Sequence, residues 1–298
     1  MESAAEKIGE DVYLIDPYAF GVKGYMSLYF IAGEKPLLFD VGPASSAGNV
    51  VSAIESLGYR GKEIEYIVVS HGHVDHAGGL WEILKWASSS HVVTAQSGLR
   101  HLSDPSKNVQ AFGTYFPQLS KLAGTFTPIA PDRIEAASVE LNMGDKVARL
   151  VTLPGHAHSQ IGLQYGRILL AADSLSTNIV LGQYYLPPSY PPHFDFSKYT
   201  ENLDHVLSFT ADTLCISHFG VHQDVASVIT KSIDSVKWFR SQVEALIRDG
   251  SSVAEAAEVL FSKHVKGAGT LPDYMVNELC RAAVAGMVNS IQKLQTHR

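Results

Sequence analysis

The chain has 298 residues, of which 46% are hydrophobic, so it is long enough for a sizeable core and too apolar to be disordered. Its 23 basic and 30 acidic residues give a net charge of −7, which argues against a general binder of the nucleic-acid backbone but does not exclude a small anionic substrate. No apolar run reaches about 18 residues, the length of a membrane span, and residues 1–10 lack a signal-peptide pattern. The two cysteines, Cys215 and Cys280, predict no disulfide framework and indicate the reducing cytoplasm.

The first 220 residues alternate short apolar runs with helical patterns, which indicates an α/β fold. Strands are predicted at residues 12–15, 26–32, 37–39, 64–70, 92–95, 147–153, 161–165, 167–172 and 214–217. Apolar residues at helical spacing predict helices over 50–57 and from residue 80 onward, and Gly58 stands where a helix-ending glycine is expected. The segment 184–196 contains four prolines and five aromatic residues and is predicted to be a stiff, irregular loop.

The last part of the chain has a helical pattern throughout. An amphipathic pattern from Val225, a capping box of Ser252 and Glu255, and a further pattern beyond them predict three helices. We therefore divide the chain into a first domain at 1–224 and a helical C-terminal extension at 225–298. The extension carries few polar groups suited to chemistry, which favours a packing or dimerisation element over a substrate-binding one.

The sharpest motif is His71-x-His73-x-Asp75-His76, which directly follows the predicted strand 64–70. Other predicted strands also end on residues that can carry chemistry, namely Asp40, His156 after a Pro-Gly pair, Asp173 and His218. In layered α/β folds, rigid strands hold such groups in loops at their ends. Imidazole and carboxylate together suit Zn²⁺, Fe or Mn, and the motif has no cysteine and too many ligands for one closed structural zinc site.

This pattern resembles the signature of the metallo-β-lactamase superfamily over residues 40–220. The resemblance implies an α/β fold, an αββα sandwich with metals along one edge, followed by the helical extension. The implied ligands are His71, His73 and His156 for one metal and Asp75, His76 and His218 for the other, with Asp173 between the two. The aspartate at position 173 is similar to the glyoxalase II, lactonase and phosphodiesterase branches, whereas the zinc β-lactamases proper often have a cysteine near this place.

The resemblance implies a metal-dependent hydrolase with two divalent ions per chain, Zn²⁺ as first choice and Fe or Mn as alternatives. A metal-bridging hydroxide would attack a small ester, thioester or lactone, or a phosphodiester or β-lactam, with Asp75 and Asp173 as catalytic residues. Two other interpretations stay open, a mononuclear-iron oxidoreductase similar to persulfide dioxygenases and a non-catalytic binding protein. We expect a small-molecule substrate and neither nucleic acid nor membrane as a partner, and the extension could support a homodimer.

Further residues are candidates for the surroundings of the metals. Asp40 ends a buried strand and is expected to orient a metal-binding histidine. His158 lies two residues after His156, and His222 lies four residues after His218, on the same face if that segment is helical. Both are candidate contacts to the site. The candidate walls of the substrate pocket are Phe20, Tyr25, Met26, Tyr184, Tyr185 and His193.

Overall fold

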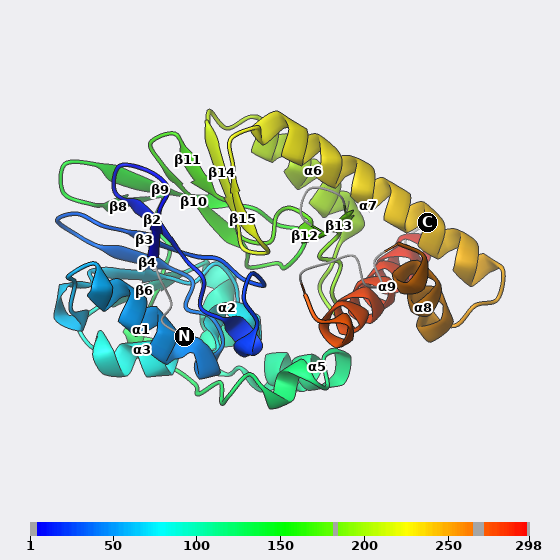
Figure 1. Cartoon of the computed structure of the whole chain (residues 1–298), viewed down its shortest axis with the longest axis horizontal. Helices are drawn as coiled ribbons and strands as arrows, with labels where there is room; N and C mark the ends of the chain where they lie inside the picture. The colour runs from blue at the N-terminus through cyan, green and yellow to red at the C-terminus, as the bar shows by residue number, and fades with distance from the viewer. Residues whose placement is uncertain (1–4, 181–183, 265–270, 297–298) are drawn as a thin grey trace.

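The computed structural model describes residues 5–180, 184–264 and 271–296, apart from the side chains of 178–180, 184–185 and 263–264. Its body consists of two β-sheets that face each other, with helices on both outer faces (Figure 1).

The first sheet contains seven strands in chain order. They are β1 (Ala5–Lys7), β2 (Val12–Ile15), β3 (Leu28–Ile31), β4 (Leu37–Phe39), β5 (Tyr66–Val68), β6 (His91–Thr94) and β7 (Ile134–Ala136). Strands β1 to β4 are antiparallel, whereas β4 to β7 are parallel, with Phe39 opposite Val68 and Val68 opposite Val93. The carboxyl ends of β4 and β5 therefore meet at one edge, which places Asp40 beside the loop that begins at Ser70.

The second sheet contains six strands in the order β15-β14-β11-β10-β9-β8. They are β8 (Glu140–Asn142), β9 (Val147–Thr152), β10 (Ile161–Tyr165), β11 (Ile168–Leu170), β14 (Thr213–Ile216) and β15 (Gly220–His222). Strand β10 is antiparallel to both β9 and β11, and β11 is parallel to β14, with Leu170 opposite Cys215. The strands β9, β11 and β14 therefore run in the same direction, so the residues that follow them, His156, Asp173 and His218, come to one edge of the sheet.

The two sheets bury an apolar layer between them. Leu14 and Tyr29 of the first sheet belong to the same buried cluster as Leu163 and Cys215 of the second. The outer face of the first sheet is covered by α1 (Ala47–Ser56) and α3 (Leu80–Trp86), and that of the second by α6 (Phe196–Leu207) and α7 (Val225–Arg248) (Figure 1). The αββα sandwich that the family resemblance implied is therefore confirmed.

The remaining elements are α2 (Val74–Ala77), α4 (Leu99–Ser103), α5 (Ser106–Tyr115), α8 (Val253–His264), α9 (Asp273–Thr296) and a hairpin of β12 (Thr177–Val180) and β13 (Tyr184–Leu186). Of these helices, α5 lies at the bottom of Figure 1 and α8 and α9 lie at its right, whereas α2 lies near the centre. Within the described ranges, no helix combines the length and the apolarity that crossing a membrane requires.

Local structure differs from the sequence-based expectation in several places. The segment 184–196 is not irregular throughout, because β13 occupies its start and α6 begins at Phe196. The Asp195 side chain caps α6 by accepting a hydrogen bond from the backbone N–H of Lys198, and the prolines all lie between the two elements. Helices α4 and α5 were not predicted, because both are short and no residue of α5 is fully buried.

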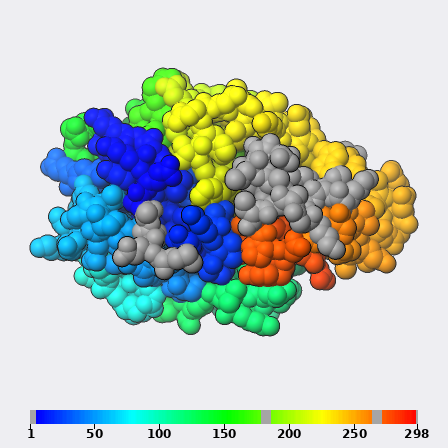
Figure 2. Space-filling view, in the orientation of Figure 1, coloured from blue at the N-terminus to red at the C-terminus, as the bar shows by residue number. Residues whose placement is uncertain are grey.

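The helical extension packs closely on the sandwich. Helix α7 lies along α6, and α9 contacts α5, α6 and α7. Val236 of α7 and Met287 of α9 belong to the same hydrophobic cluster as Ile67 of the first sheet. In the space-filling view the extension, coloured yellow to orange, is continuous with the body (Figure 2). The predicted capping box is confirmed, since Ser252 N and Oγ donate to the Glu255 carboxylate and Ser252 Oγ accepts from Glu255 N.

A buried carboxylate ties α9 to the segment that follows α5. Glu278 is only 6% exposed, and it accepts hydrogen bonds from the backbone N–H groups of Gln118, at 2.7 Å, and Leu119, at 3.2 Å. We expect Glu278→Ala to lower the free energy of unfolding by about 2 kcal/mol, because two backbone donors lose their charged acceptor. Urea unfolding measures this loss, and Glu278→Gln, which keeps one acceptor oxygen, should lose less. An unchanged urea midpoint for Glu278→Ala would contradict the expectation.

Candidate metal centre

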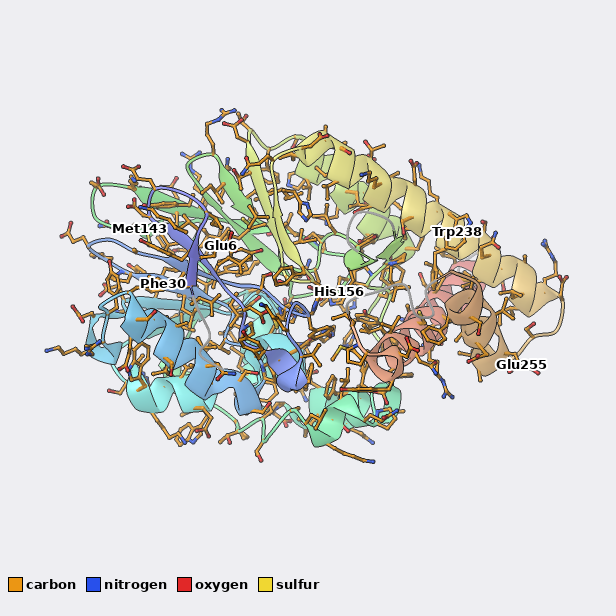
Figure 3. The ribbon with its side chains drawn as sticks, viewed as in Figure 1. Glu6, Phe30, Met143, His156, Trp238 and Glu255 are labelled. Carbon is orange, nitrogen blue, oxygen red and sulfur yellow. The ribbon has the colours of Figure 1, made fainter. Side chains whose placement is uncertain are left out.

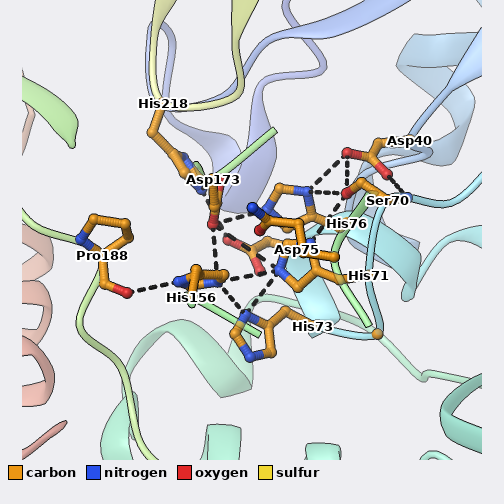
Figure 4. Close-up of polar contacts among 12 residues, drawn as sticks. Asp40, Ser70, His71, His73, Asp75, His76, His156, Asp173, Pro188 and His218 are labelled. Carbon is orange, nitrogen blue, oxygen red and sulfur yellow. Dashed lines mark hydrogen bonds and ion pairs between the residues drawn. The ribbon is translucent and has the colours of Figure 1, made fainter. Parts of the chain in front are cut away.

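All seven predicted metal ligands come together where the strands of both sheets end (Figure 4). They form two groups, and within each group the ligand atoms lie within 4.8 Å of one another: His71, His73, His156 and Asp173 in one, and Asp75, His76 and His218 in the other. The motif after β5 supplies one part of this cluster, and the loops after β9, β11 and β14 supply the other. The cluster therefore joins the two sheets.

Three imidazole nitrogens of the first group point at a common centre. His71 Nε2 lies 2.9 Å from His73 Nδ1, and His156 Nε2 lies 3.2 Å and 3.0 Å from these two atoms. Ligands at about 2.0 Å from a tetrahedral Zn²⁺ would be about 3.3 Å apart. The spacing of the three nitrogens is therefore close to that of a tetrahedral ligand set.

Asp173 lies between the two groups. Its Oδ2 atom is 3.3 Å from His156 Nε2 and 3.4 Å from His76 Nε2, and its Oδ1 atom is 3.5 Å from His218 Nε2. His218 Nε2 is also 3.5 Å from Asp75 Oδ2. The Asp173 carboxylate thus faces imidazoles of both groups, His156 and His76 through Oδ2 and His218 through Oδ1.

The outer ring nitrogens of three histidines fix which nitrogen carries the proton. His156 Nδ1 lies 2.6 Å from the carbonyl oxygen of Pro188, and His218 Nδ1 lies 3.1 Å from that of Tyr25. A carbonyl oxygen only accepts hydrogen bonds, so each Nδ1 carries the hydrogen, and in the neutral ring Nε2 keeps its lone pair. His76 Nδ1 faces the Asp40 carboxylate at 2.9 Å in the same way. This arrangement is typical of metal-binding histidines.

Two buried atoms of the cluster have no hydrogen-bond partner among the described residues, His76 Nε2 and Asp173 Oδ1. Buried polar atoms without a partner are costly, and a bound cation would satisfy both. The donor set contains imidazole nitrogens and carboxylate oxygens but no thiolate, which suits Zn²⁺, Fe or Mn. The residues present therefore fit a divalent metal.

The electrostatics keep His71, His73 and Asp173 in forms that bind cations. Burial, together with the neighbouring histidines, lowers the pKa of His71 and of His73 well below the ordinary value. Burial alone would raise the pKa of Asp173, but His76, His218 and His156 hold it well below its ordinary value. At neutral pH, His71 and His73 are therefore neutral and Asp173 is ionised. Burial alone would lower the pKa of His76 and of His218, but Asp173 raises both, so these two rings would release a proton when they bind a cation.

A cavity of about 370 Å³ opens in front of the cluster. Its floor includes the ligands His73, Asp75 and Asp173. Its walls and mouth are formed by Tyr25, Val74, Ser97, Arg100, His101, Asp104, Lys107, Asn108, Ala111, Phe112, Tyr115, Phe116, Tyr190, Pro191, Pro192 and His193. A small molecule that enters this cavity reaches the ligand cluster directly.

Of the predicted wall residues, Tyr25 and His193 line the cavity. The Tyr25 hydroxyl donates to Asp75 Oδ2 at 3.2 Å. Phe20 and Met26 are instead buried in the hydrophobic core, where Phe20 packs behind Tyr25 with ring centroids 5.6 Å apart. An aromatic or apolar residue near a site packs the core as readily as it lines a pocket, and the sequence pattern does not distinguish the two.

Neither His158 nor His222, the two further candidate histidines, belongs to a ligand group. His158 is exposed and stands beside His193, with ring centroids 5.2 Å apart. His222 lies on strand β15 and not on a helix, so the condition for a shared helical face with His218 is not met. The side chains of Tyr184 and Tyr185 lie outside the described residues.

Sequence reasoning missed the wall that α4 and α5 contribute. Phe112, Tyr115 and Phe116 of this wall are three and four residues apart, so they share one face at the end of α5. This aromatic spacing is the signal that could have identified the wall. Asn108 of α5 also donates to the carbonyl oxygen of Gly72, between the first two histidines of the motif.

Asp40, which was predicted to orient a metal-binding histidine, contacts both Ser70 and His76. One of its oxygens accepts from Ser70 N at 2.7 Å, and the other accepts from Ser70 Oγ at 2.8 Å and faces His76 Nδ1 at 2.9 Å. Asp40 has a positive φ of 60°, a conformation that asparagine tolerates better than most residues.

We expect Asp40→Asn to keep the backbone but to weaken metal binding about 10- to 100-fold, because the amide nitrogen cannot accept both hydrogen bonds. Competition with a chelator of known affinity measures the change. Wild-type affinity in Asp40→Asn would show that Asp40 only shapes the turn.

Helix α9 supports His156 through the loop that carries Pro188. Ser189 Oγ donates to the Ala283 carbonyl oxygen at 2.9 Å, and a Cβ atom added at Gly286 would stand 1.9 Å from the Ser189 carbonyl oxygen. Figure 3 shows His156 between the sandwich and α9. The extension thus fixes the loop whose carbonyl orients a candidate ligand.

We expect Gly286→Ala to weaken metal binding about 10-fold, because the added methyl group displaces Ser189 and with it the Pro188 carbonyl. On helix propensity alone, this substitution would stabilise the protein by about 1 kcal/mol. Gly113→Ala in α5, where an added Cβ meets nothing within 4 Å, is the matched control and should leave metal affinity unchanged. Equal chelator competition curves for the two variants would contradict the role of α9.

Comparisons with known proteins identify the family of this chain. The family model described as "Metallo-beta-lactamase superfamily" matches residues 22–218, more than half of the chain. The metallo-beta-lactamase fold-containing protein ST1585 of Sulfurisphaera tokodaii is 24% identical over 209 residues, which cover 65% of this chain and 73% of that protein.

Two solved structures share the fold over nearly the whole chain. The crystal structure of ST1585, from Sulfolobus tokodaii, has a TM-score of 0.71 at 17% identity and covers 95% of this chain and 100% of that one. The metallo-beta-lactamase family protein TTHA1429 from Thermus thermophilus has a TM-score of 0.70 at 18% identity, with 97% and 95% covered. On the match over residues 22–218, this chain belongs to the metallo-β-lactamase superfamily.

Proposed function

We propose that this protein is a metal-dependent hydrolase that uses two divalent ions, with Zn²⁺ as first choice, to cleave a small ester, thioester or lactone. The observation that carries the proposal is the pair of complete donor groups with Asp173 between them. Members of the superfamily are mostly metal-dependent hydrolases, and solved structures of metallo-β-lactamases share the fold, which supports the reaction class.

Each ligand has a defined role in this proposal. His71, His73 and His156 would hold one ion, whereas Asp75, His76 and His218 would hold the other, and Asp173 would contact both. Two bound ions would supply a water of lowered pKa and polarise the acyl oxygen of the substrate.

The protein's own groups prepare the site for this chemistry. Asp75 lines the cavity and receives the Tyr25 hydroxyl on Oδ2, so its carboxylate is held where it can accept a hydrogen bond from an attacking water. The aromatic side chains of Tyr25, Tyr190 and Phe116 line the space in front of it and exclude bulk water. These walls suit an acyl compound with an apolar part.

The second donor group favours this proposal over a mononuclear-iron oxidoreductase. Asp75, His76 and His218 offer ligand atoms that lie within 4.8 Å of one another, and one ion held by the first group would leave this second group unused. We further propose that the protein works in the cytoplasm, because Cys215 and Cys280 are both free and buried. Its proposed substrate is a small molecule, which the cavity of about 370 Å³ could admit.

Metal analysis and hydrolysis assays test the proposal together. We expect about two zinc ions per chain and hydrolysis of p-nitrophenyl esters or lactones that a chelator abolishes. His156→Ala and Asp173→Ala should lose bound metal, and their hydrolysis rate should fall by more than about 100-fold. His205→Ala, an exposed histidine on α6, is the control. Full metal occupancy with unchanged hydrolysis in the first two variants, or about one iron per chain without hydrolysis in the wild type, would overturn it.

A further inference from the structure

We propose that the substrate of this site carries an anionic group beyond an apolar segment, and that Arg100, Lys107 and Lys293 at the cavity mouth bind that group. The inference rests on the proposed hydrolase function and names its substrate class. It depends on the division of the cavity into an apolar middle and a basic mouth.

The middle of the cavity is apolar and aromatic. Phe112 and Phe116 stack with ring centroids 5.2 Å apart, and Phe116 meets Tyr190 edge-on at 5.3 Å. Tyr190 in turn reaches His156, with ring centroids 5.9 Å apart. A charged group in this stretch would be desolvated without a partner, so the part of the substrate next to the reacting carbonyl must be apolar.

The mouth of the same cavity is basic, although the whole chain carries a net charge of −7. Arg100 follows β6 on α4, and Lys107 lies on α5. Both line the cavity, both are exposed, and neither forms an ion pair with another described residue. Lys293 of α9 donates from Nζ to the carbonyl oxygen of Pro192 at 3.1 Å, and because Pro192 lines the cavity, a third ammonium group stands beside it.

One carboxylate, Asp104, also lies at the mouth. Its Oδ1 atom accepts hydrogen bonds from the Oγ and the backbone N–H of Ser106. These hydrogen bonds, together with Arg100 and Lys107, lower the pKa of Asp104. The mouth therefore keeps an excess of positive charge, with three cations around one carboxylate.

Two neutral histidines complete the mouth. Burial, together with His158 and His101, lowers the pKa of His193 to about 4, and burial lowers the pKa of His101. Both rings are therefore uncharged at pH 7 and offer ring N–H donors to an anion. The permanent positive charge at the mouth therefore comes from Arg100, Lys107 and Lys293.

The cavity connects the two ends of this substrate. The ligands His73, Asp75 and Asp173 line the same cavity of about 370 Å³ as Arg100 and Lys107. A single flexible molecule with a reactive acyl group at one end and a carboxylate or phosphate at the other can therefore contact both. Such an anion would gain affinity and a faster, salt-sensitive association.

A matched pair of esters tests the inference. p-Nitrophenyl hexanoate and mono-p-nitrophenyl adipate have the same chain length, but the second ends in a carboxylate in place of a methyl group. We expect kcat/KM for the adipate ester to exceed that for the hexanoate ester by about five-fold at low salt, and this ratio to fall as salt screens the mouth.

Substitutions at the mouth assign the preference to its charges. The triple variant Arg100→Gln, Lys107→Gln, Lys293→Gln should bring the ratio down to about one, whereas Asp104→Asn should raise it. Lys62→Gln, an exposed lysine that does not line the cavity, is the matched control and should leave the ratio unchanged. Calorimetric binding of adipate against hexanoate to the zinc-loaded protein gives a second readout that needs no turnover.

The outcomes separate the two proposals. Hydrolysis of both esters with a ratio of about one, or a preference that the triple variant retains, would overturn the anionic substrate class and leave the hydrolase function in place. Absence of hydrolysis of either ester would count against the hydrolase function. In that case tighter binding of adipate than of hexanoate, lost in the triple variant, would still support the basic mouth, and equal binding would overturn it.

Discussion

The burial of one carboxylate among histidines from both sheets is the constraint on which the site depends. Asp173 is 3% exposed, and its two oxygens face imidazoles that follow β9 and β14 as well as one from the motif after β5. A buried charge must be compensated, and a bound cation compensates it more fully than histidines whose own charge depends on pH. The relative position of the two sheet edges is thus coupled to metal binding, and bound metal would stabilise the folded sandwich.

The ligands keep their orientation because other parts of the chain hold their outer nitrogens. His156 is held by the Pro188 carbonyl, His218 by the Tyr25 carbonyl and His76 by the Asp40 carboxylate. Two of these three acceptors are main-chain atoms. The orientation of the ligands therefore depends on the path of the backbone in two loops, and substitutions that move those loops act on the metal without touching a ligand.

These contacts also explain how far the sequence alone could go. The seven ligands were predictable because each belongs to a short local pattern at the end of an apolar strand, such as the motif after Val68 or the Pro-Gly before His156. The carbonyl of Pro188 was not, because every residue has a carbonyl and only the fold decides which one meets a histidine. Met26 and His222 could not be placed from the sequence for a related reason. The short pattern around Met26 fits either a pocket wall or the core, and that around His222 fits either a strand or a helix.

Most residues that line the cavity are separate from the candidate metal ligands, although three of the ligands form its floor. The candidate ligands stand at the ends of strands in the two sheets. Most of the cavity wall comes instead from α4, from α5 and from the proline-rich loop that contains Tyr190, Pro191, Pro192 and His193. Both the segment after α5 and the proline-rich loop contact α9. Glu278 of α9 accepts hydrogen bonds from the segment after α5. On the other side, Lys293 donates to the proline-rich loop, and Gly286 lets that loop approach the helix closely.

The sheets bring the ligands to one edge. The helical extension sets the spacing of the two sides of the wall and, through the loop that carries Pro188, also helps to orient His156. Arg100, Lys107 and Lys293 are exposed side chains at the mouth, so their charge can change without disturbing a ligand. Specificity in this chain is accordingly expected to follow the sequence of α4, α5 and α9 more closely than that of the motif.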